Sequence, residues 1–178
     1  MNSLEGTLKE KNIIFIGFMG VGKSTIGKLV AQKLQWDFVD IDEEIEKEYE
    51  MKVSEIFNKI GEVSFREKEK TVITSLCEQH RRVLSLGGGA FLQEEIRKVC
   101  LSSSMVILLD LSFENWQKRV SRIIDSRPVL QGKSIEEMKE LFDKRQEFYS
   151  NHHLKIVTDN KNAEEIANQI VNELATLM

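Results

Sequence analysis

Short apolar runs alternate with longer amphipathic segments along the chain, and this alternation predicts strands separated by helices. The apolar runs are rich in Ile, Val and Leu, whereas the amphipathic segments repeat their apolar positions every three or four residues. We expect strands at residues 12–17, 36–42, 82–86, 105–111 and 155–158. We expect helices at about residues 23–34, 43–50, 54–61, 62–78, 94–100, 112–120, 134–149 and 163–177. This order is typical of an α/β fold in which helices cover both faces of a parallel sheet and ligands bind at the carboxyl ends of the strands.

Capping residues mark several of the expected helix boundaries. Ser112 and Ser134 stand where a serine hydroxyl can accept a hydrogen bond from a backbone N–H of the first turn. Glu137, three residues after Ser134, completes the pattern of a capping box. We expect Ser54 to begin a short helix and Gly61 to end it.

The strongest motif lies between the first strand and the first helix. Gly17, Gly22, Lys23 and Ser24 match the phosphate-binding pattern G-x-x-x-x-G-K-[ST]. Glycines let backbone N–H groups approach phosphate oxygens, the lysine reaches the β- and γ-phosphates, and the serine hydroxyl is a ligand suited to Mg²⁺. A glycine-rich turn is the alternative, but the strand before the motif and the helix after it favour a nucleotide site. The residues expected to contact ATP here are Gly20, Val21, Gly22, Lys23, Ser24 and Thr25.

Two carboxylates follow the second expected strand. Asp40 and Asp42 fall on the same face, about 7 Å apart, where a cation or a hydroxyl donor would relieve their repulsion. We therefore expect functional roles, because carboxylates at strand ends suit magnesium and substrate hydroxyls. The alternative is that the strand has ended and that Asp42 caps the acidic helix 43–50.

Three further features bear on a second ligand. Gly87, Gly88 and Gly89 follow the third strand, where glycines are useful for close backbone approach to a ligand, although a flexible turn is the alternative. Arg145 lies on the apolar face of helix 134–149, and a cation there needs an anion. Arg66, by local pattern alone, is more often a surface arginine that pairs with Glu62 one turn before it or with Glu69 one turn after it.

Composition limits the class of protein. The 178 residues suit one domain, and the net charge of −4 argues against a general nucleic-acid surface. No apolar run is long enough to span a membrane, and the first residues lack a signal-peptide pattern, so we expect a cytoplasmic protein. Cys77 and Cys100 lack metal-binding spacing and are expected to be buried thiols.

These motifs, in this order, resemble those of the shikimate kinase family over nearly the whole chain. The matching segments are G-F-M-G-V-G-K-S-T at 17–25, F-V-D-I-D at 38–42, G-E-x-x-F-R at 61–66, G-G-G at 87–89, R-P-V-L at 127–130 and R-x-x-x-Y at 145–149. The resemblance implies a nucleoside-monophosphate-kinase-like P-loop α/β/α sandwich of three layers, with a five-stranded parallel sheet in the order 2-3-1-4-5. It implies a single kinase domain over residues 1–178, with substrate-binding helices at about 43–78 and a lid at about 122–133.

The resemblance also implies the reaction and the roles of individual residues. MgATP would phosphorylate the 3-hydroxyl of shikimate, in the pathway to chorismate and the aromatic amino acids, and a monomer is expected. Lys23, Asp42 and Arg127 would be catalytic, with Arg127 meeting the transferring phosphoryl group. Ser24 and Asp40 would hold Mg²⁺, and Asp42, Arg66, Gly87, Gly88, Gly89 and Arg145 would bind shikimate.

One departure from the family pattern affects the adenine contact. The family usually has an arginine seven residues before the lid Arg-Pro pair, where this chain has Val120. Arg119 and Arg122 are the nearest arginines, and the later adenine loop offers Lys161 in place of an arginine. Two rivals to the family remain open at this point: a gluconate kinase of the same fold, and a binding module that has lost turnover.

Overall fold

The computed structural model describes residues 10–120 and 130–177, in which five parallel strands form one sheet. The strands are β1 (Asn12–Ile16), β2 (Asp37–Asp40), β3 (Arg82–Ser85), β4 (Ser104–Asp110) and β5 (Leu154–Val157). Their order in the sheet is β2-β3-β1-β4-β5, which confirms the predicted order. In the register of the central strands, Ile14 pairs with Leu84 on one side and with Val106 on the other.

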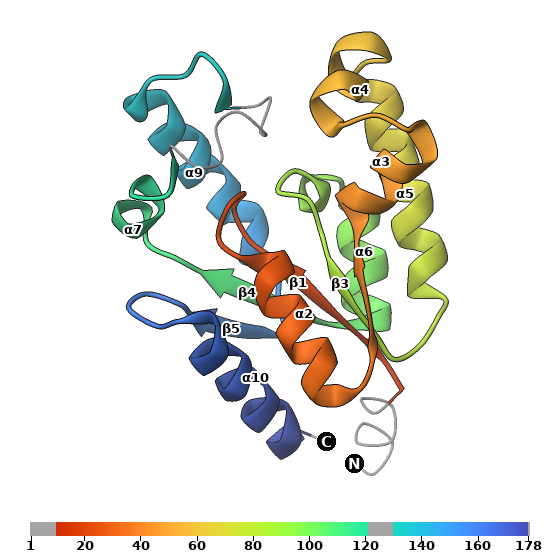
Figure 1. Ribbon diagram of the computed structural model, residues 1–178, viewed down its shortest axis with the longest axis vertical. Helices are drawn as coiled ribbons and strands as arrows, with labels where there is room; N and C mark the ends of the chain where they lie inside the picture. Colours follow the sequence, from red (N-terminus) through yellow and green to blue (C-terminus); the bar gives the residue numbers. More distant parts are fainter. Residues whose placement is uncertain (1–9, 121–129, 178) are drawn as a thin grey trace.

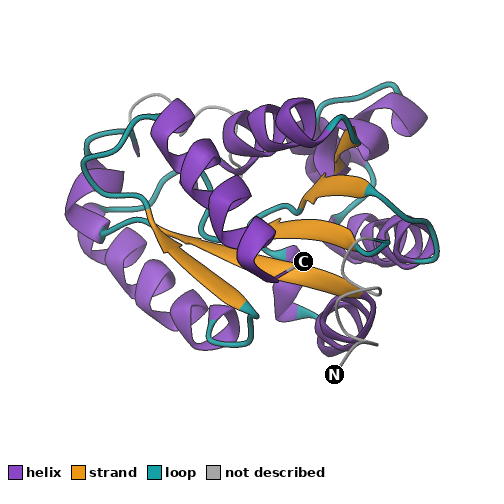
Figure 2. Cartoon of the chain, turned by 90° about the horizontal axis from the view of Figure 1, so that it is seen from below, coloured by secondary structure: helices purple, strands orange, loops and turns teal. Residues whose placement is uncertain are grey.

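Helices cover both faces of this sheet and give the predicted three layers (Figures 1 and 2). The helices α2 (Lys23–Leu34) and α10 (Ala163–Leu177) pack against each other on one face. On the other face, α6 (Glu94–Ser103) packs against β4, α5 (Glu62–Cys77) packs against α6, and α9 (Ile135–Tyr149) packs against the short helix at residues 90–92. The sandwich follows from the right-handed connections that parallel strands require.

Shorter helices extend beyond the carboxyl ends of the strands. They are α3 (Ile41–Tyr49), α4 (Val53–Lys59), the 3₁₀ helix η1 (Ala90–Leu92) and α7 (Phe113–Gln117). In Figure 1, α3 and α4 lie together at the upper right, above the end of β2. No helix within residues 10–120 or 130–177 is both long enough and apolar enough to cross a membrane.

The core explains why the central strands read as continuous apolar runs. All five residues of β1 are buried, and so are the first six of β4, because helices cover both faces of these strands. The edge strand β5 is different: only Ile156 is buried within it. The two cysteines, Cys77 and Cys100, are free and buried, as expected.

Two boundaries near the second strand differ from the prediction. The strand ends at Asp40, and Asp42 lies in the first turn of α3 instead of on the strand. The N-cap of α3 is Asp40, whose carboxylate accepts a hydrogen bond from the backbone N–H of Glu43 at 3.1 Å. The alternative that Asp42 caps this helix is therefore wrong. Local hydrogen bonding by Asp40 therefore stops the strand two residues early.

Other helix boundaries differ from the prediction in part. The helix α4 begins at Val53 after Lys52, so Ser54 is not its cap, and Gly61 is the N-cap of α5 with a φ of 107°. The helix α7 ends at Gln117, which leaves Arg119 and Val120 beyond it. Ser112 caps α7, and Ser134 with Glu137 forms the predicted capping box of α9. Most of the predicted lid, including Arg122 and Arg127, lies outside the described residues.

Candidate active site

The phosphate-binding motif forms a tight loop between β1 and α2. Gly20 and Gly22 have φ values of 80° and 99°, in the left-handed region that side chains rarely adopt. Gly17 has no room for a side chain, because a Cβ there would lie 2.8 Å from the carbonyl oxygen of Leu109. The loop is held from outside by the buried indole of Trp116, whose Nε1 donates to the carbonyl oxygen of Met19 at 2.7 Å.

Lys23 begins helix α2 and folds back over the loop. Its side-chain nitrogen donates to the carbonyl oxygens of Gly17 at 2.6 Å and Phe18 at 3.1 Å, and the residue is buried. These carbonyl contacts hold the ammonium group beside the backbone N–H groups of the loop. A phosphate bound there would meet both the cation and the positive end of the α2 dipole.

A cavity of about 300 Å³ opens beside this loop and brings most of the predicted residues together. Its walls come from the phosphate loop, from the end of β2 and the start of α3, and from the segment after β3. The predicted site residues that line it are Gly20, Gly22, Lys23, Ser24, Thr25, Asp40, Asp42, Gly87 and Gly88. The carboxyl edge of the sheet is thus the site, as the fold class requires.

Oxygen atoms gather at one wall of the cavity. The Ser24 hydroxyl donates to the Asp40 carboxylate, and it lies 3.2 Å from the Ser85 hydroxyl. Hydroxyl and carboxylate oxygens are the ligands that Mg²⁺ prefers, and Mg²⁺ usually takes only one or two protein ligands beside phosphates and water. The donor set at Ser24 and Asp40 therefore fits magnesium that arrives with a nucleotide.

The three glycines after β3 lie against three predicted shikimate ligands. A Cβ on Gly87 would lie 2.8 Å from Oδ1 of Asp42. A Cβ on Gly88 would lie 3.3 Å from Nη1 of Arg145, and one on Gly89 would lie 2.5 Å from Nη2 of Arg66. Missing side chains thus let one carboxylate and two guanidinium groups converge on the same short segment. This arrangement favours the ligand-binding role of the glycines over a merely flexible turn.

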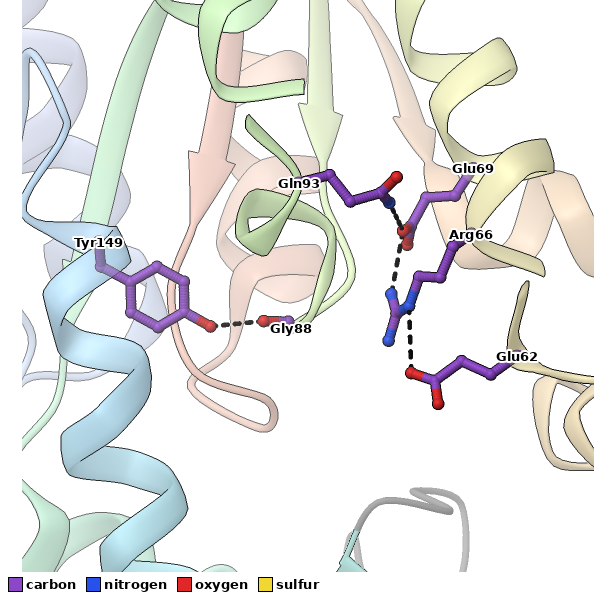
Figure 3. Close-up of polar contacts among 6 residues, drawn as sticks. All are labelled: Glu62, Arg66, Glu69, Gly88, Gln93 and Tyr149. Atoms are coloured by element: carbon purple, nitrogen blue, oxygen red, sulfur yellow. Dashed lines mark hydrogen bonds and ion pairs between the residues drawn. The ribbon is translucent and has the colours of Figure 1, made fainter. Parts of the chain in front are cut away.

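Arg66 makes both of the surface-type ion pairs that its local pattern predicted. Its Nη1 lies 2.9 Å from Oε1 of Glu69 and its Nε lies 3.5 Å from Oε1 of Glu62, as Figure 3 shows. The side chain is nevertheless only 19% exposed, because it is packed against Gly89 and the rings of Phe57 and Phe65. Ion pairs and packing therefore fix the Arg66 side chain in one position at the edge of the site.

Glu69 is the buried carboxylate that forms an ion pair with Arg66. It is fully buried, and Oε1 also accepts a hydrogen bond from Nε2 of Gln93 at 3.0 Å (Figure 3). Its second oxygen, Oε2, has no hydrogen-bond partner among the described residues. Burial raises the pKa of Glu69 to about 7, against the opposing attraction of Arg66 and with a further increase from Asp42.

Arg145 is a buried cation whose charge is not balanced by an ion pair among the described residues. It is 5% exposed on the buried face of α9, and neither Nε nor Nη1 has a hydrogen-bond partner within residues 10–120 and 130–177. Its guanidinium lies 5.9 Å from the centre of the Phe18 ring, and burial lowers its pKa. A buried guanidinium with two unpartnered nitrogens beside Gly88 indicates an anion-binding position.

Arg119 lies where the phosphate loop meets a second, smaller cavity. This cavity of about 190 Å³ shares Gly22, Thr25 and Arg119 with the first, and its other walls include Thr158 and Lys161. Of the two arginines near the family's adenine position, Arg119 is thus the one placed beside the loop; Arg122 lies outside the described residues.

Comparisons with known proteins agree with this geometry. The family model described as "Shikimate kinase" matches residues 19–175. The chain belongs to the shikimate kinase family. It is 53% identical to a shikimate kinase of Bacillus licheniformis over 96% of this chain and 97% of the relative, and 52% identical to one of Bacillus subtilis over 94% and 90%.

A solved structure supports the same assignment at the level of the fold. The shikimate kinase from Acinetobacter baumannii in complex with shikimate superposes with a TM-score of 0.89 at 31% identity, covering 97% of both chains. Shikimate kinases are ATP-dependent phosphotransferases, so the predicted enzyme class is confirmed. The gluconate kinase alternative is therefore set aside.

The sequence did not identify two residues of this shikimate kinase site as buried supports of it; Glu69 was expected only as a possible surface partner of Arg66. Glu69 is on the apolar stripe of α5, four residues from Phe65 and four from Ile73, and an acidic residue in such a stripe was the signal that could have identified it. Tyr149 was quoted only as the end of the R-x-x-x-Y motif. Its hydroxyl donates to the carbonyl oxygen of Gly88 at 2.6 Å, a contact between segments 61 residues apart that no local pattern reveals.

Proposed function

We propose that this chain transfers the γ-phosphoryl group of ATP to the 3-hydroxyl of shikimate, with the two substrates meeting in the cavity beside the phosphate loop. The observation that carries the proposal is Arg145, a buried cation with two unpartnered nitrogens that lies against Gly88, and Gly88 lines that cavity. A substrate carboxylate would supply the missing anion, and shikimate has one carboxylate.

Two arginines bind that carboxylate in this proposal. Arg145 contributes its unpartnered guanidinium nitrogens, and Arg66 contributes Nη2, the nitrogen nearest to Gly89. Planar guanidinium groups suit this task because they donate two parallel hydrogen bonds to a carboxylate. Gly87, Gly88 and Gly89 let the ring of the substrate come close to the backbone.

The phosphates of ATP bind along the loop and the start of α2. The backbone N–H groups of residues 20–25 and the Lys23 ammonium neutralise the β- and γ-phosphates. In this proposal, Arg127 and Arg122 of the lid would complete this charge, and closure of residues 122–133 would exclude water. Arg119 is the candidate for contact with the nucleoside, because it lines both cavities.

Magnesium belongs with the nucleotide in this scheme. When bound, Mg²⁺ would neutralise negative charge on the β- and γ-phosphate oxygens. The Ser24 hydroxyl would hold it, and the Asp40 carboxylate, which accepts the hydrogen bond from Ser24, would orient that hydroxyl and a bound water.

Asp42 orients the attacking hydroxyl. Its carboxylate faces Gly87 from the first turn of α3, and it lines the same cavity as the phosphate loop. A positioned carboxylate can accept the hydroxyl proton as the new P–O bond forms, although a loose phosphoryl-transfer transition state needs little from a base. Orientation is therefore its main contribution.

We further propose that the enzyme works as a monomeric, single-domain protein of the cytoplasm without a nucleic-acid partner. The support is general. One sheet and one core account for all described elements, and the net charge of −4 does not suit a polyanion.

Exchange of Arg145 for Lys tests the carboxylate site. Lysine keeps the positive charge and most of the apolar stem but cannot donate two parallel hydrogen bonds, so the KM for shikimate should rise about 100-fold while the KM for ATP changes less than about twofold. Arg82→Lys is the matched control, because Arg82 stands at the opposite end of β3 and pairs with the exposed Asp37. An unchanged KM for shikimate in Arg145→Lys, or an equal loss in Arg82→Lys, contradicts the proposed role.

A further inference from the structure

Tyr149 joins the last turn of α9 to the triple-glycine segment. Its side chain is 1% exposed, and its hydroxyl donates to the carbonyl oxygen of Gly88 at 2.6 Å, as Figure 3 shows. Burial raises the pKa of this hydroxyl to about 12, so the group keeps its proton and remains a donor throughout the physiological range. The bond is short and shielded from water, and it crosses from the helical layer to the carboxyl edge of the sheet.

The same hydroxyl lies next to Arg145. The two residues are one helical turn apart on α9 and share its buried face. The electrostatic interaction with Tyr149 opposes the effect of burial on the pKa of Arg145. Tyr149 therefore contacts Gly88 directly and lies beside the guanidinium that also approaches Gly88, although it does not line the cavity itself.

Gly88 has no side chain that could fix its backbone conformation, so another residue has to restrain it. Glycine permits many backbone conformations, and the segment must remain in one of them for Asp42, Arg66 and Arg145 to converge on it. Since the peptide unit is planar and trans, fixing the Gly88 carbonyl also fixes the direction of the Gly89 N–H, which points the opposite way. One hydrogen bond thus sets two backbone groups at the substrate wall.

We propose that Tyr149 is a positioning residue for the acidic substrate: through its hydroxyl it fixes Gly88 and the Arg145 guanidinium in the geometry that binds the substrate carboxylate, without contacting the substrate. The proposal rests on the proposed function, in which that carboxylate belongs to shikimate. It differs from a purely structural role, in which the hydroxyl only satisfies a buried carbonyl oxygen and loss of it weakens the fold without changing substrate preference.

Tyr149→Phe tests this with the loss of one oxygen atom and no change in ring shape. The KM for shikimate should rise about tenfold, with the KM for ATP changed less than about twofold. Thr176→Val is the matched control, because it also removes one hydroxyl that donates to a backbone carbonyl oxygen, that of Glu173 at 2.7 Å, but near the end of α10 (Ala163–Leu177) and away from the site. That variant should keep both KM values.

A second measurement separates the carboxylate effect from general damage. The methyl ester of shikimate lacks the charge, so as a competitive inhibitor it should bind wild type and Tyr149→Phe equally, while shikimate should bind the variant about tenfold more weakly. Equal weakening of ester and acid, equal rises in both KM values, or an unchanged KM for shikimate would each overturn the inference. If instead the wild-type protein forms no ADP with shikimate, it is the proposed function that fails.

Discussion

Replacement of Glu69 by Gln should make the stability of the protein fall less as the pH rises from about 5 to about 8. Glu69 is fully buried beneath Arg66, and its pKa is raised from 4.5 to about 7, chiefly by burial. The folded protein therefore holds a proton on this carboxyl group over a range in which the unfolded chain has already released it. Glutamine keeps the size and the acceptor oxygen for Arg66 and Gln93 but has no proton to lose.

The sign and size follow from proton linkage. Because the folded pKa is the higher one, the free energy of unfolding is greatest below about pH 4.5, falls by about 1.4 kcal/mol per pH unit as the pH rises, and levels off above about pH 7. Between about pH 5 and about pH 8 this group alone removes about 2.5 kcal/mol of stability. Other groups titrate as well, so the quantity to follow is the difference between wild type and Glu69→Gln.

Urea unfolding at a series of pH values, followed by circular dichroism, measures that difference. The variant should gain about 2.5 kcal/mol relative to wild type between about pH 5 and about pH 8. Glu62→Gln is the control, because it removes the other carboxylate paired with Arg66 from a side chain that is 62% exposed. Parallel curves for wild type and Glu69→Gln, or the same pH-dependent gain in Glu62→Gln, would refute the reasoning.

Two further predictions concern the lid and the capping box. Arg127→Ala should reduce kcat about 10³-fold or more and leave the Kd for ATP nearly unchanged. Steady-state kinetics measures the first quantity and nucleotide titration the second. Equal losses in kcat and in ATP affinity would contradict the assigned role. Ser134→Ala removes the hydroxyl that accepts from the Glu137 N–H at 3.2 Å and should lower the free energy of unfolding by about 1 kcal/mol in urea, whereas an unchanged midpoint would mean that the box contributes nothing.

Long periodic segments allowed most of the fold to be predicted from the sequence. The phosphate loop, the strand order and the capping box of α9 follow from local spacing or from the resemblance, and the structure has all three. The end of β2 was misplaced because Asp40 can either continue a strand or cap a helix, and only the tertiary position of α3 decides between them.

The candidate site was predictable where chemistry stands out from its surroundings. Arg145 was identifiable as a cation on an apolar stripe, and its burial with unpartnered nitrogens agrees with that expectation. Glu69 is likewise a charged residue on an apolar helix face, but the sequence suggested only that it could pair with Arg66 at the surface. Tyr149 could not be assigned from the sequence alone, because its contact with Gly88 depends on how α9 crosses the end of β3.

The central claim is that shikimate is the acceptor, and a coupled ADP-release assay with MgATP tests it most directly. The account predicts ADP release that requires shikimate, is absent with gluconate or without an acceptor, and disappears in Lys23→Ala. Tight shikimate binding with no ADP release would identify a binding module that has lost turnover. Release of ADP at the same rate with and without shikimate would contradict the account.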